Sequence, residues 1–488
     1  MSTGEGNRLE GDSVKAFLGG SWIALGNFSV SLTGLLFWLI MPRLIGMRSL
    51  GEASEIISAA MLAVTLVSAG LPLAVIREVA ELRERGYLAA AVTGAALAII
   101  AGLLAAVLAA VLGYSRYWLA AFALAMLSTA SIPLIQGLVG LERYPTYFRA
   151  LAVASTTKLL LGALLGLLGY GLLAALLGYL AHPLVLLGVA LVVLVRVAGS
   201  VQLRGLMGYA RRVAGLALSN YPQAVSLQLM SVLSVYLFAL IVGKPVNTGA
   251  LYISLMAVLA LSMVPNALMT AALPVSVESG REEVIRDQLR IGLGIATPII
   301  SLFIAAPRLA LGLIKPELAS IAGTAFLLML LSTTPLVAIQ AAINILNKRR
   351  DEKALLVIGG VRLVVLIVAI AALATRLGID GAALAFLAAN LAALPLAARV
   401  LGHGSRIVLT TWGVQLLFAP LYLLGLGPGA ELLAGLAALA VSALLVHLFS
   451  VLRIDEALVL VRLFARSLIY AQHRGRVLRQ KRSKDNER

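Results

Sequence analysis

The sequence predicts an all-α polytopic membrane protein of about fourteen transmembrane helices, and three observations support this fold class. Hydrophobic residues make up 61% of the chain and charged residues only 12%. The mean hydropathy of +1.00 is far above that of soluble domains. Apolar stretches of roughly 18 residues or more recur along the chain, and each is long enough to cross a bilayer as a helix.

Glycines, prolines and charge clusters separate the apolar stretches and so place the helix ends. The expected helices lie at 17–41, 53–76, 88–112, 117–140, 147–168, 171–195, 213–242, 249–277, 289–313, 318–346, 354–375, 379–401, 409–427 and 430–452.

The distribution of basic residues predicts the orientation. Most of the 39 lysines and arginines fall on one side of the membrane if the N-terminal tail is cytoplasmic. We therefore expect a multi-pass protein of the cell membrane with both termini in the cytoplasm. No basic, apolar and small-residue cleavage pattern precedes the first helix, which we expect to be uncleaved.

The net charge of +17 lies in loops and tails beside apolar helices. This placement favours anionic phospholipids over nucleic acid as the partner. The basic tail 453–488 also has apolar residues at helical spacing, so we expect an amphipathic helix on the inner leaflet. Docking of a partner protein is the alternative for this tail.

Several chemistries are excluded by what the chain lacks. It has no cysteine and only four scattered histidines, so we expect no disulfide, catalytic residue, metal site or cofactor, and no enzyme activity. The 22 acidic residues are all expected in loops, tails or helix ends, with Glu52 and Glu55 on the outer side. A carboxylate inside the membrane for a coupling cation is therefore not expected.

An internal repeat divides the chain. Residues 127–160 match 331–364 without a gap, and "LSTASIPLIQ" lies over "LSTTPLVAIQ". The repeat is six helices long, which predicts two bundles related by an axis along the membrane normal, flanking a central cavity. We expect a tail at 1–16, an N-lobe at 17–200 (helices 1–6), a C-lobe at 201–408 (helices 7–12), two further helices at 409–452 and the tail 453–488.

Two cations occupy the same position of this repeat, because Lys158 matches Arg362. Lys158 lies roughly 14 Å from the helix end, close to a bilayer midplane. With no carboxylate expected at this depth, the missing anion is interpreted as a substrate, and two cations at matching depth could hold a diphosphate. The alternative is that each side chain reaches water or a glutamate at a helix end.

The first helix of each half is unusually polar. "GNFSVSLT" carries Asn27, and "SNYPQAVS" carries Asn220 and Gln223, followed by Gln228. Amides at this depth belong in helix interfaces or wet cavities, so these four residues are candidate substrate contacts. Pro222 is expected to kink the seventh helix.

Two stretches resemble the polysaccharide or oligosaccharide flippases, the Wzx type, of the multidrug/oligosaccharidyl-lipid/polysaccharide (MOP) exporter superfamily. The resemblance in the first hairpin, 36–81, rests on Arg43, Leu44, Gly46, Gly51, Gly70, Leu71, Ala74 and Arg77. The second stretch, 376–401, carries Gly378, Gly381 and Ala382 at similar positions. The layout, with two extra terminal helices, is also similar to that of the flippase of the peptidoglycan precursor.

The resemblance implies a V-shaped fold of two lobes, shared with MATE transporters, that alternates between inward and outward openings. It implies movement of a glycan linked to a polyprenyl phosphate or diphosphate, with glycan-assembly proteins as partners. Arg43 is then a candidate cavity residue or, equally, an interfacial anchor. Relatives often carry an acidic residue near Val235 and Tyr236, and this chain does not.

Two other functions remain open. A MATE-type multidrug or cation-coupled antiporter would share the fold, but Lys158 and Arg362 would repel its organic cations. A non-transporting membrane scaffold for a glycan-assembly complex would need no solvent access at these two residues.

Overall fold

The computed structural model is built of helices and describes the backbone of residues 3–198 and 206–452, which contain no β-strand. Its α-helices are α1 (Thr3–Ile45), α2 (Met47–Ser68), α3 (Leu71–Leu82), α4 (Glu84–Val111), α5 (Trp118–Gly140), α6 (Tyr144–Leu167), α7 (Leu172–Ala198), α8 (Leu206–Val242), α9 (Pro245–Leu261), α10 (Met263–Ser279), α11 (Glu283–Ala305), α12 (Pro307–Ile314), α13 (Pro316–Leu331), α14 (Thr333–Arg349), α15 (Glu352–Leu401), α16 (Gly404–Leu416) and α17 (Pro428–Leu448). Two 3₁₀ turns, η1 (Ser115–Tyr117) and η2 (Ala419–Leu424), complete the list. The tail 453–488 lies outside the described residues.

Within the described ranges, eleven helices are long and apolar enough to cross a membrane, or up to twelve if the bent pair α9 and α10 forms one span. The all-α transmembrane fold class is therefore confirmed, while the number fourteen stays a prediction. Twelve and fourteen differ by two helices. The apolar part of α8, Leu229–Val242, is too short to count as a span, and α15 counts as one span although it contains two helices.

α15 contains two helices that run in opposite directions. Gly378 has a non-helical backbone with φ 57° and ψ −130°. A Cβ atom at Gly381 would lie 2.9 Å from the backbone nitrogen of Ala374. The chain therefore reverses at Gly378, as expected between the predicted helices 354–375 and 379–401.

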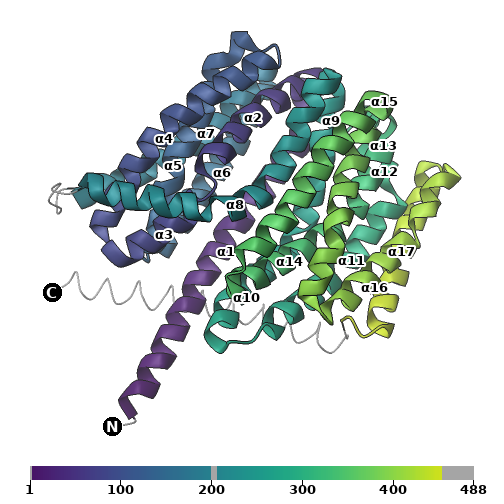
Figure 1. Cartoon of the computed structure of the whole chain (residues 1–488). Coiled ribbons are helices and arrows are strands. Elements are labelled where there is room, and N and C mark those ends of the chain that lie inside the picture. The colour runs from purple at the N-terminus through teal and green to yellow at the C-terminus, as the bar shows by residue number, and fades with distance from the viewer. Residues whose placement is uncertain (1–2, 199–205, 453–488) are drawn as a thin grey trace, which may run out of the picture.

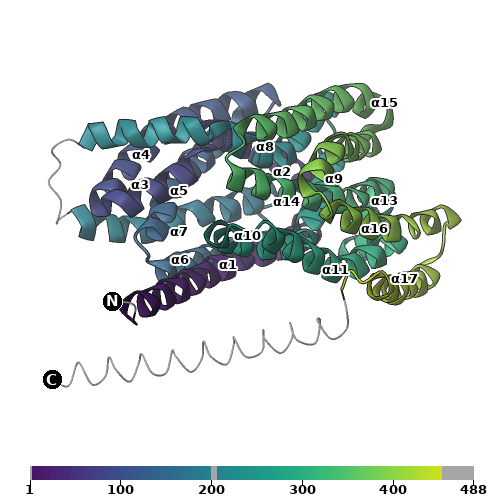
Figure 2. The ribbon, with the colours of Figure 1, turned by 60° about the horizontal axis from the view of Figure 1, so that its bottom comes forward.

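The helices form two groups (Figure 1). α1 to α7 pack on one another and form the first bundle, and α9 to α17 form the second bundle. α8 packs on α2, α3 and α4 of the first bundle and on α15 of the second. The predicted boundary between the lobes near residue 200 stays a prediction, because α8 contacts both bundles. In Figure 2, α1 and α8 run along opposite sides of the first bundle.

Several predicted single helices are broken in the structure. The predicted helix 53–76 is α2 and α3, and the predicted helix 318–346 is α13 and α14. The second break follows from Pro335, which has no N–H to donate to the carbonyl of Leu331. That carbonyl instead accepts a hydrogen bond of 2.9 Å from Nε1 of Trp412 on α16.

Two further differences concern helix ends. The predicted helix 249–277 is α9 and α10, bent by 43°, and the predicted helix 289–313 is α11 followed by the short α12. α1 begins at Thr3, so residues 3–16 of the predicted tail continue the first helix. Sequence patterns place the apolar centre of a helix better than its ends, because the ends depend on local capping.

Candidate functional site

The two bundles meet along α2 and α9, and we call this contact the outer seam, after the orientation predicted from the sequence. A Cβ atom at Gly51 would overlap the carbonyl oxygen of Pro245, and one at Gly249 would lie 3.0 Å from the Cα of Gly51. The two backbones are therefore in direct contact, which requires residues without side chains.

Arg43 at the end of α1 adds a polar contact between the bundles. Its Nε donates a hydrogen bond of 2.7 Å to the carbonyl of Ile314, and its Nη2 donates to the carbonyl of Leu313. Both carbonyls lie at the C-terminal end of α12, where they lack partners within the helix and the helix dipole is negative. The structure thus places the Arg43 guanidinium on the second bundle, and a contact with substrate stays a prediction.

The other end of α12 is capped as well. Oε2 of Glu431, from α17, accepts a hydrogen bond of 2.7 Å from the backbone N–H of Leu309. The Glu431 carboxylate is buried and meets the positive end of the α12 dipole. α12 therefore contacts α17 at its N-terminal end and, through Arg43, the first bundle at its C-terminal end.

Glu55 corrects the expectation that no carboxylate lies inside a membrane span. α2 begins at Met47 rather than near residue 53, so Glu55 is in the third turn of a span and only 3% exposed. Its Oε2 accepts a hydrogen bond of 2.5 Å from the hydroxyl of Tyr114, and the hydroxyl of Thr248 on α9 is a further polar neighbour of the carboxylate. The only break between α1 and α2 is Gly46, with φ 79°, and this glycine is the sequence signal for the early start of α2.

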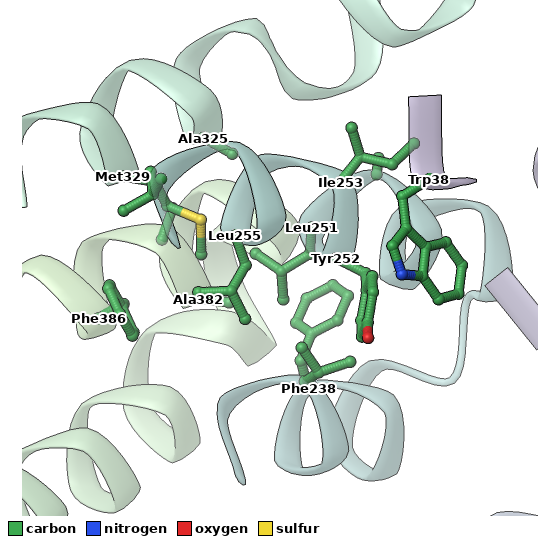
Figure 3. Close-up of a cluster of buried hydrophobic side chains, with 14 of the residues drawn as sticks. Trp38, Phe238, Leu251, Tyr252, Ile253, Leu255, Ala325, Met329, Ala382 and Phe386 are labelled. Atoms are coloured by element: carbon green, nitrogen blue, oxygen red, sulfur yellow. The ribbon is translucent and has the colours of Figure 1, made fainter. Parts of the chain in front are cut away.

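A cluster of aromatic rings crosses from the first bundle to α9. The ring of Trp38 on α1 lies 4.5 Å from the ring of Tyr252 on α9. The hydroxyl of Tyr179 on α7 hydrogen bonds to that of Tyr252. Figure 3 shows Tyr252 between Trp38 and Phe238, which lies on α8. Sequence analysis did not identify these residues, because aromatic side chains in apolar helices carry no pattern that indicates their contacts.

Lys158 on α6 lies beside this cluster and is 5% exposed. Its Nζ lies 4.8 Å from the ring centre of Tyr179 and 5.6 Å from that of Phe37, and both are cation–π contacts. Within the described residues, no carboxylate lies at salt-bridge distance from Lys158. His182 on α7 is a second polar neighbour that the sequence did not indicate, and its Nδ1 is buried without a partner.

Arg362 on α15 is 1% exposed and also has no carboxylate at salt-bridge distance in the described part of the chain. Its Nη2 donates a hydrogen bond of 3.0 Å to Oδ1 of Asn390, whose amide in turn donates to the carbonyl of Phe386. Nε of Arg362 is buried without a partner. A neutral amide therefore accepts one hydrogen bond from the guanidinium but does not neutralise the charge of Arg362.

The structure does not bring Lys158 and Arg362 into contact. The neighbours of Lys158 lie on α1 and α7 of the first bundle, and Asn390 lies on the second helix of α15 in the second bundle. Their convergence on one anion stays a prediction, and both side chains are buried in this conformation.

The polar residues of the first helix of each half are only partly described. Asn27 on α1 is exposed, and its Oδ1 accepts a hydrogen bond of 3.4 Å from the hydroxyl of Tyr147 on α6. The side chains of Asn220, Gln223 and Gln228, and of Pro222, lie outside the described residues. Among the residues that are described, no group of three or more histidines and carboxylates could hold a metal ion.

The opposite end of the bundles, the inner end, carries ion pairs. Oε1 and Oε2 of Glu282 accept hydrogen bonds of 2.7 Å from Nε and Nη2 of Arg349, and Arg286 also donates to Oε2. The hydrogen bonds from Arg349 hold the pKa of Glu282 below its usual value. At the same end, Arg212 of α8 pairs with Glu78 and Glu81 of the first bundle.

Comparison with known proteins finds matches in structure but not in sequence. Neither a protein-family model nor a curated protein matches the chain. Its fold is similar to that of a structure described as the lipid II flippase MurJ in an inward closed conformation. That comparison has a TM-score of 0.65, 12% sequence identity, and covers 88% of this chain and 99% of the other.

Two MATE transporters have related folds. The eukaryotic MATE transporter AtDTX14 has a TM-score of 0.56, is 14% identical, and the match covers 83% of this chain and 99% of that one. An inward-facing multidrug resistance MATE family transporter of the MOP superfamily has a TM-score of 0.53, is 14% identical, and the match covers 79% and 94%. The chain therefore has the fold of MOP superfamily transporters, as predicted.

Proposed function

We propose that this chain moves a lipid-linked oligosaccharide or polysaccharide unit, carried on a lipid phosphate or diphosphate, from the cytoplasmic to the external leaflet by alternating access. The observation that carries the proposal is the pair Lys158 and Arg362. Both are buried, both lie at the same position of the repeat, and neither has a carboxylate partner among the described residues.

The energetics favour an external anion. A cation at the centre of a membrane helix costs roughly 3 kcal/mol on insertion scales. Cation–π contacts such as those of Lys158 return about 0.5–2 kcal/mol, and the amide of Asn390 supplies no negative charge to Arg362. Phosphate oxygens would neutralise both cations when the bundles rearrange and uncover them, and the guanidinium could donate two parallel hydrogen bonds.

The comparisons support the class of the substrate. A structure of similar fold is that of a lipid II flippase by its own description, and the proposal carries the lipid-linked substrate over to this chain. A membrane potential that is negative inside assists the export of an anion by roughly 2.3 kcal/mol per charge per 100 mV.

The second candidate function is a MATE-type multidrug or cation-coupled antiporter. The MATE folds favour it, and so does Glu55, because this buried carboxylate removes one argument against cation coupling. Lys158 and Arg362 argue against organic cations as the substrate, since like charges repel at this depth. Competition by cationic dyes for the bound lipid separates the two candidates.

A non-transporting scaffold is the third candidate. The chain has no cysteine, so single cysteines introduced at 158 and 362 can be labelled without background. A scaffold leaves both positions unreactive toward a membrane-impermeant thiol reagent in every condition. A flippase uncovers them in one of its conformations.

The experiment that tests the proposal measures thermal stabilisation of the purified protein by a polyprenyl-diphosphate sugar and by the matched neutral polyprenol. Wild type is compared with Lys158→Ala/Arg362→Ala. The matched control, Arg116→Ala/Arg376→Ala, removes two exposed cations from helix ends.

Stabilisation of wild type and control by the diphosphate alone, with its loss in Lys158→Ala/Arg362→Ala, is the expected result. A ligand at 100 times its Kd stabilises a protein by about 2.7 kcal/mol, so the loss is measurable as a shift of the melting temperature. Equal stabilisation of all three proteins would show that the two buried cations do not hold the headgroup.

A further inference from the structure

Glu55 is a buried carboxylate at the contact between the two bundles. It lies on α2 in the outer seam, and its Thr248 neighbour belongs to α9 of the second bundle. The side chain is 3% exposed. Its surroundings therefore change whenever α2 and α9 separate. Glu55 is also the only acidic residue of α2 that is buried.

The hydrogen bonds of Glu55 do not neutralise a charge. Tyr114 and Thr248 supply neutral hydroxyl groups, while Oε1 is buried without a partner. Ser58, three residues further along α2 and so on the same face of the helix, has a buried hydroxyl that also lacks a partner. No lysine or arginine in the described part of the chain lies at salt-bridge distance from Glu55.

The charged groups near Glu55 oppose an ionised state. Glu52, one turn earlier on α2, carries a charge of the same sign that acts on Glu55. Arg48 is the nearest cation on this helix, but its Nε pairs with Glu52 at 3.2 Å and its side chain is 83% exposed. From α4 and η1 the facing group is Tyr114, and from α9 it is Thr248, neither of which is a cation.

A buried carboxylate without a cation is unfavourable, and the usual outcome is that the group takes up a proton. A protonated carboxyl group keeps the hydrogen bond from Tyr114 on one oxygen and carries its proton on the other. The closed seam therefore fits a neutral Glu55. When α9 moves away, the Glu55 side chain loses its Thr248 neighbour and becomes accessible to water. Water then solvates the ionised carboxylate.

We propose that Glu55 is a proton-binding site of the outer seam, protonated when the seam is closed and ionised when it is open. In the step, the carboxylate oxygen of Glu55 takes one proton from the solution on the outer side as the seam closes, and the O–H bond breaks again on opening. By linkage, a ligand that binds one conformation favours that conformation, so protons favour the closed seam.

The proposal requires only that the seam opens, and it does not depend on the substrate proposed above. Its consequence is that opening toward the outer side is coupled to the proton concentration there. The ion that couples to opening would be a proton. The test below distinguishes a proton from a monovalent metal ion bound at Glu55.

The test measures the distance between two spin labels across the seam as a function of pH, without substrate. Cysteines replace Ser115 and Leu377, which are exposed at the outer ends of the two bundles, and the cysteine-free chain makes both labels specific. Titration from about pH 5 to pH 9 covers the range in which buried carboxyl groups lose their protons. The population with the larger distance is expected to rise with pH.

In Glu55→Gln this pH response is expected to vanish, with the seam closed throughout, because the amide mimics the neutral carboxyl group. The matched control Glu52→Gln removes the neighbouring carboxylate and is expected to keep the response. Tyr114→Phe and Thr248→Val remove donors that favour the charged form, so opening is expected at a higher pH in each. These two variants test the proposal even if Glu55→Gln does not fold.

Three results would overturn the proposal. One is the absence of any pH response in wild type, and the second is an unchanged response in Glu55→Gln together with unshifted midpoints in Tyr114→Phe and Thr248→Val. The third is a distance distribution that follows the sodium or potassium concentration at constant pH, which would assign a metal ion to Glu55 in place of the proton.

Discussion

A methyl group at Gly51 is expected to prevent closure of the outer seam. The Cβ of Gly51→Ala would overlap the carbonyl oxygen of Pro245 and lie 2.9 Å from its Cα. Carbon atoms that are not bonded prefer separations of about 3.5–4.0 Å. α2 and α9 would therefore have to separate by about 1 Å or more, and they cannot do so by rotating a side chain, because both obstructing atoms belong to the backbone.

The size of the effect follows from this overlap. Forcing one extra carbon into a tightly packed contact costs about 1–3 kcal/mol. Each 1.4 kcal/mol changes a ratio of populations tenfold, so closed-to-open populations are expected to fall by about 5- to 150-fold. The measurement is the distance distribution between spin labels at Ser115 and Leu377 at a pH where wild type is closed.

The matched control is Gly188→Ala, at a helical glycine of α7 where a Cβ atom meets nothing within 4 Å. It is expected to leave the distance distribution unchanged and to stabilise the helix by up to about 1 kcal/mol. A distribution in Gly51→Ala that is identical to that of wild type would refute the reasoning, since the seam would then tolerate a side chain at its closest contact.

Three further predictions concern polar contacts. Arg43→Gln removes the charged donor to the carbonyls at the end of α12. Because these hydrogen bonds are exposed to solvent, the closed seam is expected to lose only about 1 kcal/mol of stability, and the population with the larger distance between the labels is expected to grow. Trp412→Phe leaves the carbonyl of Leu331 without its donor at the break between α13 and α14, and this is expected to cost about 1–3 kcal/mol, visible as a lower melting temperature. Because Arg349 holds the pKa of Glu282 below its usual value, this pair stabilises the protein above about pH 4 and is lost as pH falls through the lowered pKa. The melting temperature of wild type should therefore fall in acid more steeply than that of Glu282→Gln, and equal slopes would contradict this.

The break between α13 and α14 shows why helix continuity could not be predicted. Pro335 is visible in the sequence, but many membrane helices continue past a proline. Here the freed carbonyl of Leu331 is satisfied by Trp412, which lies 81 residues away along the chain. The sequence contains both residues and no indication that they meet.

Glu55 shows how a small error in a helix boundary changes a functional conclusion. A second helix that starts at residue 53, as the sequence predicts, places Glu55 at a helix end on the outer side. The start at Met47 places it two turns inside the helix, and the contact of α2 with α9 buries it. The boundary depends on Gly46, and the burial depends on a neighbour almost 200 residues further along the chain.

The sequence by itself determined the all-helical fold class and the presence of many helices apolar enough to cross a membrane. These follow from hydrophobicity and helix length, which are properties of local segments. It also indicated the resemblance to MOP transporters, whose fold the structure has.

Only the tertiary structure decided which groups meet. The contacts of Arg43 with α12, of Glu55 with Thr248 and of Trp38 with Tyr252 each join segments that are about 190 to 270 residues apart. Hydrogen bonds and close backbone contacts act over a few ångströms, whereas hydrophobic patterning fixes only which face of a helix is buried. Which residues meet in the outer seam is therefore decided by the packing of the two bundles, and no single segment of the sequence encodes it.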